Sequence, residues 1–270
     1  MFAFRRLLPP LAALPILFAT GFPSAPFISL AAEWVDQRPA GPFLCRAEFP
    51  ISSYEPLVRE LEQLQLDVVR LLKVGPSREI IELCLFRDER TYRSYLHAQF
   101  PGVPYRRALF VKGNGPGKVH VYRSKEFAVD VRHESTHALL HAAMPMVPLW
   151  LDEGLAEYFE VPLDQRASDN AHLKKLKLGL MVGLVPHLER LEAKHDIAEM
   201  TASDYRYAWA WVHFMLHGPP EAHDELVHFL SDIQASTPPG RLSQRLERRL
   251  PGIEKRLVRH FRTWKGEAGK

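Results

Sequence analysis

Cysteine is scarce in this sequence, and no long block of Lys and Arg occurs. The 270 residues contain two cysteines, Cys45 and Cys84, too few for a CxxC zinc ribbon or a disulfide scaffold. Lys and Arg number 35 against 32 Asp and Glu, a net charge of +3, and no long Lys/Arg block gathers it. A partnership with nucleic acid therefore has no support. The 46% hydrophobic composition, without repeats or low-complexity tracts, is that of an ordinary globular protein.

A long uncharged stretch occurs only at the N-terminus. Arg5 and Arg6 precede an apolar segment that prolines interrupt, and no further charge appears until Glu33. A basic start followed by a short apolar run is typical of a secretory signal, and small residues near Ala31 suit its cleavage. We expect residues 1–31 to be a signal peptide, export to a periplasm or outside the cell, and no membrane span in the mature protein. An N-terminally anchored form is the alternative, since the segment is long enough to cross a bilayer.

The first half of the chain mixes helix and strand signals. Apolar residues at helical spacing predict helices over 52–75 and 88–100. Short apolar runs between turn signals predict strands at 41–50, 80–86, 108–111 and 119–122. The last two flank a glycine-rich turn as a hairpin, and 119–122 is the candidate edge to which an extended peptide could add. Cys45 and Cys84 both fall in strand-like runs, where an exported protein could pair them or bury them as free thiols.

Strand signals stop after Lys125. From Glu126 to Trp264 the sequence predicts helices that Pro and Gly breaks separate, at 145–148, 162, 186, 218–220, 238–240 and 251–252. We therefore predict an α+β fold with two subdomains. A mixed α/β subdomain with a small sheet would cover 41–145, a mainly helical subdomain would cover 146–264, and a metal site would lie in the cleft between them.

His133, Glu134 and His137 form an H-E-x-x-H pattern inside a helix predicted over 126–144. Residues four apart lie on one face of a helix, so the two imidazoles can bind one zinc ion. Glu134 would project beside the metal, where it can act as a general base toward water. The competing interpretation is coincidence on a surface helix, because the sequence has 13 histidines.

A catalytic zinc also needs a third protein ligand. Pro145 and Pro148 predict a turn after the first helix, and a second helix from about Trp150 would bring Glu153 back to the metal. Glu157, one turn further, could accept the N–H of a ligating histidine. Alternatively both acids only solvate a helix, although their apolar neighbours would make two unpaired carboxylates costly. His141 and Asp130, one turn to either side of the histidine pair, are further candidates for such supporting contacts.

These motifs together resemble a known superfamily. H-E-S-T-H at 133–137, followed by P-L-W-L-D-E-G-L-A-E-Y-F-E at 148–160, is similar to the gluzincin zinc metallopeptidases, which include thermolysin and aminopeptidase N. The likeness is strongest to bacterial peptidase-MA-like proteins classed as a domain of unknown function, and it spans roughly 41–264. It implies peptide hydrolysis at a Zn²⁺ ion held by His133, His137 and Glu153, with Glu134 as the base and Glu157 behind the ligands.

The resemblance extends to a later helix. Gluzincins place a tyrosine or histidine against the substrate carbonyl, and D-Y-R-Y-A-W at 204–209 resembles that segment. This implies that Tyr205 donates to the oxyanion, with Tyr207 as the second choice and an aromatic core stripe as the alternative. His213 and His217 also stand four apart, but no glutamate follows His213 and no third ligand is evident. We expect these two to be packing or surface histidines.

The sequence thus predicts an exported zinc peptidase whose partner is a peptide or protein substrate. The absence of the G-x-M-E-N element of aminopeptidase N favours an endopeptidase. One alternative is a catalytically silent zinc protein that holds a peptide or protein of the cell envelope. Another is a structural envelope protein with a coincidental motif. No pattern in the sequence sets the cleavage preference or the oligomeric state.

Overall fold

The protein is described by a computed structural model that covers residues 34–113, 115–168 and 171–265. The signal peptide expected over 1–31 lies outside these residues. No helix in the described ranges is long and apolar enough to cross a membrane. The elements, in chain order, are β1 (Asp36–Ala40), β2 (Phe43–Ala47), α1 (Glu55–Leu72), β3 (Ile81–Phe86), α2 (Glu89–Gln99), β4 (Ala108–Val111), β5 (Lys118–Tyr122), α3 (Phe127–Ala143), α4 (Leu149–Phe159), α5 (Ala171–Met181), α6 (Leu188–Glu192), α7 (Ala202–His217), α8 (Pro220–Gln234), α9 (Leu242–Arg249) and α10 (Ile253–Thr263).

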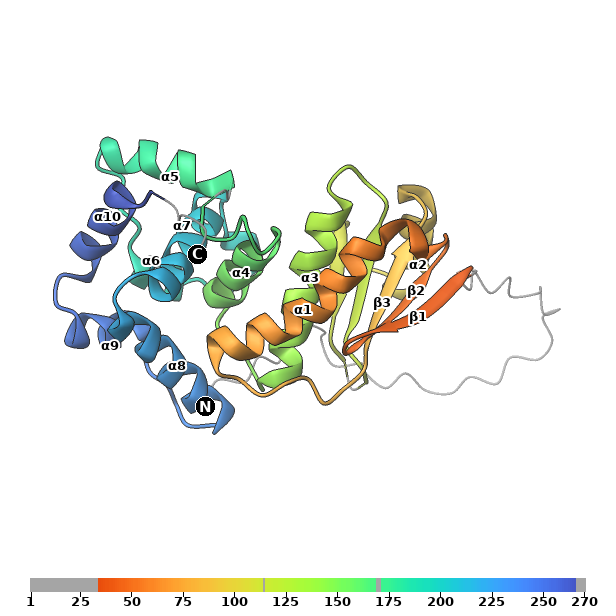
Figure 1. The fold of residues 1–270 in the computed structure, drawn as a ribbon, viewed down its shortest axis with the longest axis horizontal. Helices are drawn as coiled ribbons and strands as arrows, with labels where there is room; N and C mark the ends of the chain where they lie inside the picture. Colours follow the sequence, from red (N-terminus) through yellow and green to blue (C-terminus); the bar gives the residue numbers. More distant parts are fainter. Residues whose placement is uncertain (1–33, 114, 169–170, 266–270) are drawn as a thin grey trace, which may run out of the picture.

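The strands form one mixed sheet in the order β1-β2-β3-β5-β4 (Figure 1). The three inner strands are parallel to one another, and β1 and β4 are antiparallel to their neighbours. The predicted β4–β5 hairpin is present, but the prediction that 119–122 forms an edge is wrong. β5 pairs with β3 on its other side, which leaves β4 as the outer strand. β1 was not predicted; it is short and polar and contains Pro39, which an edge strand tolerates.

Helices cover both faces of the sheet, and the two cysteines lie on different faces. α1 and α3 pack on one face, and α2 packs on the other. In the parallel pair β2–β3, Cys45 stands opposite Leu83 and Cys84 stands opposite Arg46. Because successive side chains of a strand alternate between faces, the two thiols point away from each other. Both are free and buried, and burial raises the pKa of each to about 12. Of the two alternatives for the cysteines, the structure supports free thiols.

Beyond β5 the described residues contain helices and no strand. The predicted breaks fall between helices, except that the break at 218–220 includes Pro220, the first residue of α8. α4 and α7 pack against each other at the centre of this part. Gly154 permits the close approach, since a Cβ at this position would lie 2.7 Å from the Ala208 carbonyl oxygen. α3 contacts both the sheet strands β4 and β5 and the helix α4, so it joins the two halves of the molecule. The predicted α+β class is confirmed: a small mixed sheet precedes a mostly helical part.

Candidate metal centre

The histidines of the H-E-x-x-H pattern lie on α3 where that helix faces α4. Val131, Leu139 and Leu140 of α3 pack into the main core and fix the rotation of the helix. α4 follows a loop that Pro148 closes, and its Trp150 and Leu151 are almost fully buried. This anchoring sets α4 alongside α3.

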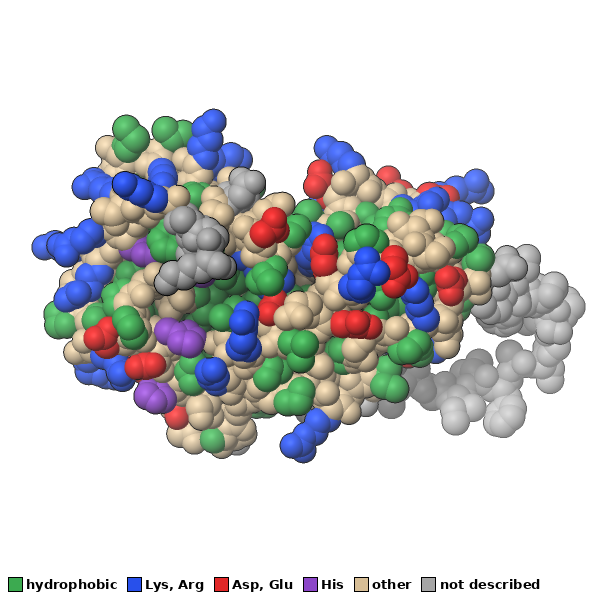
Figure 2. All heavy atoms as spheres, viewed as in Figure 1, with side chains coloured by type: hydrophobic (Ala, Val, Ile, Leu, Met, Phe, Trp, Pro, Cys, Tyr) green, Lys and Arg blue, Asp and Glu red, His purple; other side chains and the backbone are tan. Residues whose placement is uncertain are grey.

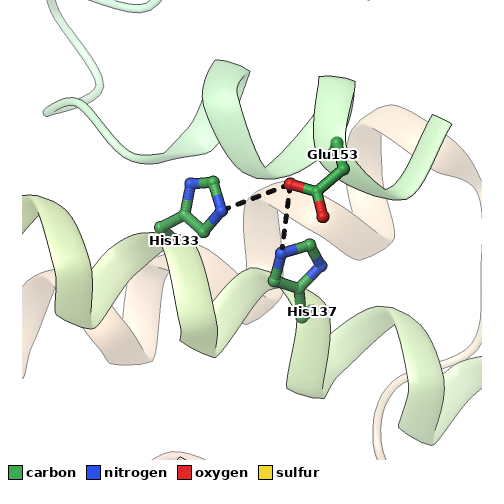
Figure 3. Close-up of side chains that lie close together, drawn as sticks. All are labelled: His133, His137 and Glu153. Atoms are coloured by element: carbon green, nitrogen blue, oxygen red, sulfur yellow. Dashed lines mark ion pairs between the residues drawn. The ribbon is translucent and has the colours of Figure 1, made fainter. Parts of the chain in front are cut away.

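Three potential ligand atoms converge between the two helices (Figure 3). Glu153 Oε2 lies 3.6 Å from His133 Nε2 and 3.8 Å from His137 Nε2. A tetrahedral zinc ion with bonds of about 2.1 Å places its ligand atoms about 3.4 Å apart. The separations are therefore close to those of a tetrahedral site, and both histidines present the same ring nitrogen. His133, His137 and Glu153 form one of the groups able to hold a metal ion.

A carboxylate accepts a hydrogen bond from the second ring nitrogen, Nδ1, of each histidine. His133 Nδ1 donates to Glu160 Oε2 at 3.0 Å, and His137 Nδ1 donates to Asp152 Oδ1 at 2.8 Å. The second oxygen of Asp152 accepts from His141 Nε2 at 2.9 Å. These bonds occupy each Nδ1 and leave each Nε2, on the side of Glu153, as the ring nitrogen that could bind a metal ion. The donor set and its supporting bonds therefore fit Zn²⁺.

The electrostatics of the site are strongly acidic. Burial lowers the pKa of His133, but hydrogen bonds with Glu153 and Glu160 outweigh it and raise that pKa well above its ordinary value. Burial of His137 is likewise outweighed, chiefly by Asp152, which brings its pKa to about 9. The same contact holds the pKa of Asp152 well below its usual range, although burial opposes the shift. The carboxylates of α4 and of Glu160 therefore favour positive charge between α3 and α4.

Glu157 occupies a different place from the expected one. It was predicted to accept from a ligating histidine, but the structure gives that contact to Glu160, and Glu157 Oε2 lies 2.6 Å from His172 Nε2. Residues 153, 157 and 160 share one helical face, and Glu160, directly after the end of α4, is the one that bonds His133 Nδ1. Glu157 stays close by, because His133, Glu157 and Glu160 form a second group of possible metal ligands that uses the same imidazole.

His141 and Asp130, the other two residues expected to make supporting contacts to the histidine pair, differ in what they contact. His141 makes the expected type of contact, through Asp152. Asp130 does not contact a ligand histidine: it accepts two hydrogen bonds from Arg107, at 2.8 Å and 2.6 Å. This ion pair ties the residue before β4 to α3.

Tyr205 lies on the acidic side of α7, and Tyr207 does not. Burial and then the charges of Glu153, Glu157 and Glu134 raise the pKa of Tyr205 to about 12. Tyr207, two residues and about 200° further round the helix, packs against the hydrophobic core. Glu134 itself is partly buried on α3, and its charge acts on both His133 and Tyr205. Tyr205 is thus the tyrosine of α7 that lies within the electrostatic influence of the site acids, whereas Tyr207 packs against the core.

Sequence reasoning missed Asp152 and Glu160, and a signal for each was available. Asp152 directly precedes the predicted ligand, and Glu160 follows it by seven residues, which is two helical turns. For His213, expected to be a packing or a surface histidine, the structure supports packing. Its side chain is fully buried beside His260 and donates to the Ala167 carbonyl oxygen.

Comparisons with known proteins identify no function. The model of a family described as a protein of unknown function, DUF1570, matches residues 128–239, a range that includes both α3 histidines and α4. No curated protein matches. Among solved structures, the fold is similar to an M1 zinc metallopeptidase from Deinococcus radiodurans, with a TM-score of 0.46 and 14% sequence identity. That match covers 84% of this chain and 50% of the other, so this chain spans about half the length of the enzyme it matches.

Proposed function

We propose that this protein is a zinc-dependent peptidase that hydrolyses peptide bonds in an extracytoplasmic compartment. The observation that carries the proposal is the convergence of His133 Nε2, His137 Nε2 and Glu153 Oε2, with carboxylates behind both rings. Three protein ligands leave a coordination position for water or substrate, which is the pattern of catalytic rather than structural zinc.

The chain supplies the remaining chemistry from α3 and α7. Zinc, when bound, supplies a Lewis acid for the scissile carbonyl and for water. Glu134 would accept a proton from the attacking water as its oxygen bonds to the carbonyl carbon. The same carboxyl would pass that proton to the amine nitrogen as the C–N bond breaks. The Tyr205 hydroxyl, kept protonated by its raised pKa, would donate to the carbonyl oxygen as negative charge develops.

An extended peptide is the substrate class that suits the neighbouring sheet edge. β4 is the outer strand beside β5, and α3 packs against it. The outward N–H and C=O groups of an edge strand can pair with an added peptide strand. The two hydrogen bonds from Arg107 to Asp130 would hold β4 at a fixed distance from the helix that carries the zinc ligands.

A peptide-library digestion tests the proposal. We expect cleavage that chelation abolishes and one equivalent of zinc restores, with internal cleavage sites if the protein is an endopeptidase. Glu134→Gln should keep the metal and lose about 100-fold or more of the hydrolysis rate. Unchanged hydrolysis in this variant would disprove the mechanism. Zinc binding without cleavage by either protein would favour a silent zinc protein, and no zinc binding at all would favour a coincidental motif.

A further inference from the structure

An exposed apolar tip projects from the far end of the helical part, away from the sheet. It lies at the end of α5 and in the turn that follows. Its four side chains are Leu178, Met181, Val182 and Leu184, which are 57%, 78%, 75% and 55% exposed. Large apolar side chains are seldom exposed together in a soluble protein without a partner. We call these four residues the α5 tip.

Basic side chains surround the α5 tip. Residues 171–185 contain three lysines and no acidic residue, and α10, which packs beside α5, contains four basic residues and one acid, Glu254. That acid is itself hydrogen-bonded to His187. Figure 2 shows the apolar side chains over α5 at the upper left of the molecule, with Lys and Arg side chains on both sides. Residues 171–185 and α10 together therefore contain seven Lys and Arg residues and one acid, Glu254.

A hollow beside the α5 tip has the same mixed character. It encloses about 460 Å³ between the α5–α6 connection and α10. Val185 and Val258 supply apolar wall. Lys255, Arg259 and Arg262 supply three positive charges against the one negative charge of Glu254, which also lines the hollow. An apolar lining with a basic rim suits an anionic headgroup and the first part of an acyl chain.

We propose that the α5 tip and its basic flank form a docking surface for an anionic lipid bilayer. Apolar side chains would enter the boundary between headgroups and acyl chains, while the lysines and arginines remain at the level of the phosphates. A second copy of the chain suits the surface less well, because two such flanks would repel each other. Residues 1–32 suit it no better, since they carry Arg5 and Arg6 and no acid.

A fluorescent label at one position tests this directly. Cys45 and Cys84 are buried, so Val182→Cys creates a single exposed thiol for an environment-sensitive dye. Leu66→Cys, on α1 in the other half of the molecule, is the matched control at similar exposure. With phosphatidylcholine vesicles that contain phosphatidylglycerol, we expect a blue shift at position 182 and none at 66. Plain phosphatidylcholine vesicles should give a much smaller response.

A second experiment removes lysine charges beside the α5 tip and measures vesicle binding. Each basic residue near an anionic surface contributes about fivefold to partitioning, so Lys174→Gln/Lys175→Gln should weaken vesicle binding about 25-fold. Arg90→Gln/Lys125→Gln removes two exposed charges near the sheet and should leave the dye response at position 182 unchanged.

Three outcomes would overturn the proposal. The first is an equal dye response at positions 66 and 182, and the second is no response at 182 when the protein sediments with vesicles. The third is a response at 182 without lipid that grows with protein concentration as the mass doubles, which would assign the surface to self-association.

Discussion

Two helices each carry histidines four residues apart, and the two pairs have opposite surroundings. On α3, His133 and His137 lie among carboxylates, which raise the pKa of both. On α7, His213 and His217 lie against the aromatic end of α10, where the His213 ring centroid is 5.1 Å from that of Phe261. Burial, with the charge of His217 second, lowers the pKa of His213 to about 3. The same spacing thus places one histidine pair among carboxylates, in a group that could hold a metal ion, and the other pair among packed aromatic rings.

The helix that packs against each histidine pair determines whether the pair lies among carboxylates or among aromatic rings. α4 directs Glu153 toward both α3 rings and holds their outer nitrogens with acids. α10 directs aromatic rings and another imidazole, His260, toward α7. A cation between α3 and α4 gains negative ligands. One beside His213 would have to displace packed rings, and the described residues place no metal-binding group of side chains there. A histidine spacing is therefore informative only together with the charges of the element that packs on it.

The largest expected effect is on metal content. Purified wild-type protein should contain about one zinc per chain. His137→Ala should contain none, because it removes one of three ligands, and His213→Ala should keep the zinc but unfold at a lower denaturant concentration. Elemental analysis with denaturant titration measures both quantities. Loss of zinc in both variants would remove the distinction between the two pairs.

The tyrosines of α7 extend the comparison to catalysis. Tyr205→Phe should lower kcat about 100-fold, the usual effect of losing one oxyanion donor, with little change in zinc content. Tyr207→Phe should leave kcat nearly unchanged, because that ring packs against the core. Initial rates on a peptide identified by library digestion give both values. An equal loss of kcat in the two variants would mean that helix packing, rather than the Tyr205 hydroxyl, is responsible.

Removing the charge of a carboxylate that hydrogen-bonds a ligand histidine should have a smaller effect, which is on zinc affinity. Asp152→Asn keeps the shape of the side chain that bonds His137 and His141, but removes its charge. We expect zinc affinity to fall about 10- to 100-fold, as for other supporting carboxylates. Glu157→Gln should weaken binding less, since Asp152 bonds a ligand histidine and Glu157 bonds His172. Competition with a chromogenic chelator measures each affinity, and a larger loss for Glu157→Gln would restore the role that the sequence predicted for it.

The sequence predicted what local spacing controls. The fold class, the helix breaks at Pro and Gly, and the face shared by His133 and His137 follow from periodicity and turn residues. The predictions from the sequence were wrong for features that depend on the order of strands in the sheet or on how one helix lies along another. The edge strand is β4 because β5 pairs with β3, and no local pattern encodes that pairing. Glu160 rather than Glu157 supports His133 because of how α4 lies along α3, which only the packed helices reveal.

The smallest expected effect concerns acid stability and comes from the histidines among packed aromatic rings. The pKa of His213 in the folded protein is about 3, well below the ordinary value near 6.5 expected on unfolding. Between these values the unfolded chain binds a proton that the folded chain does not, so the free energy of unfolding falls as the pH falls. One such histidine contributes at most about 1.4 kcal/mol per pH unit. His260, whose burial lowers its pKa to about 4, acts in the same direction.

His213→Gln should therefore reduce the slope of unfolding free energy against pH between about pH 6 and pH 4, because glutamine does not titrate. The variant should be less stable at neutral pH, so the slope rather than the absolute value carries the test. Exposed His97 provides the matched control, and His97→Gln should leave the slope unchanged. Urea titrations at a series of pH values measure all three proteins. Identical slopes of unfolding free energy against pH for wild type and His213→Gln would contradict this prediction. They would mean that His213 binds a proton in the folded protein as readily as in the unfolded chain. The α3 and α7 pairs would then differ only in their charged neighbours.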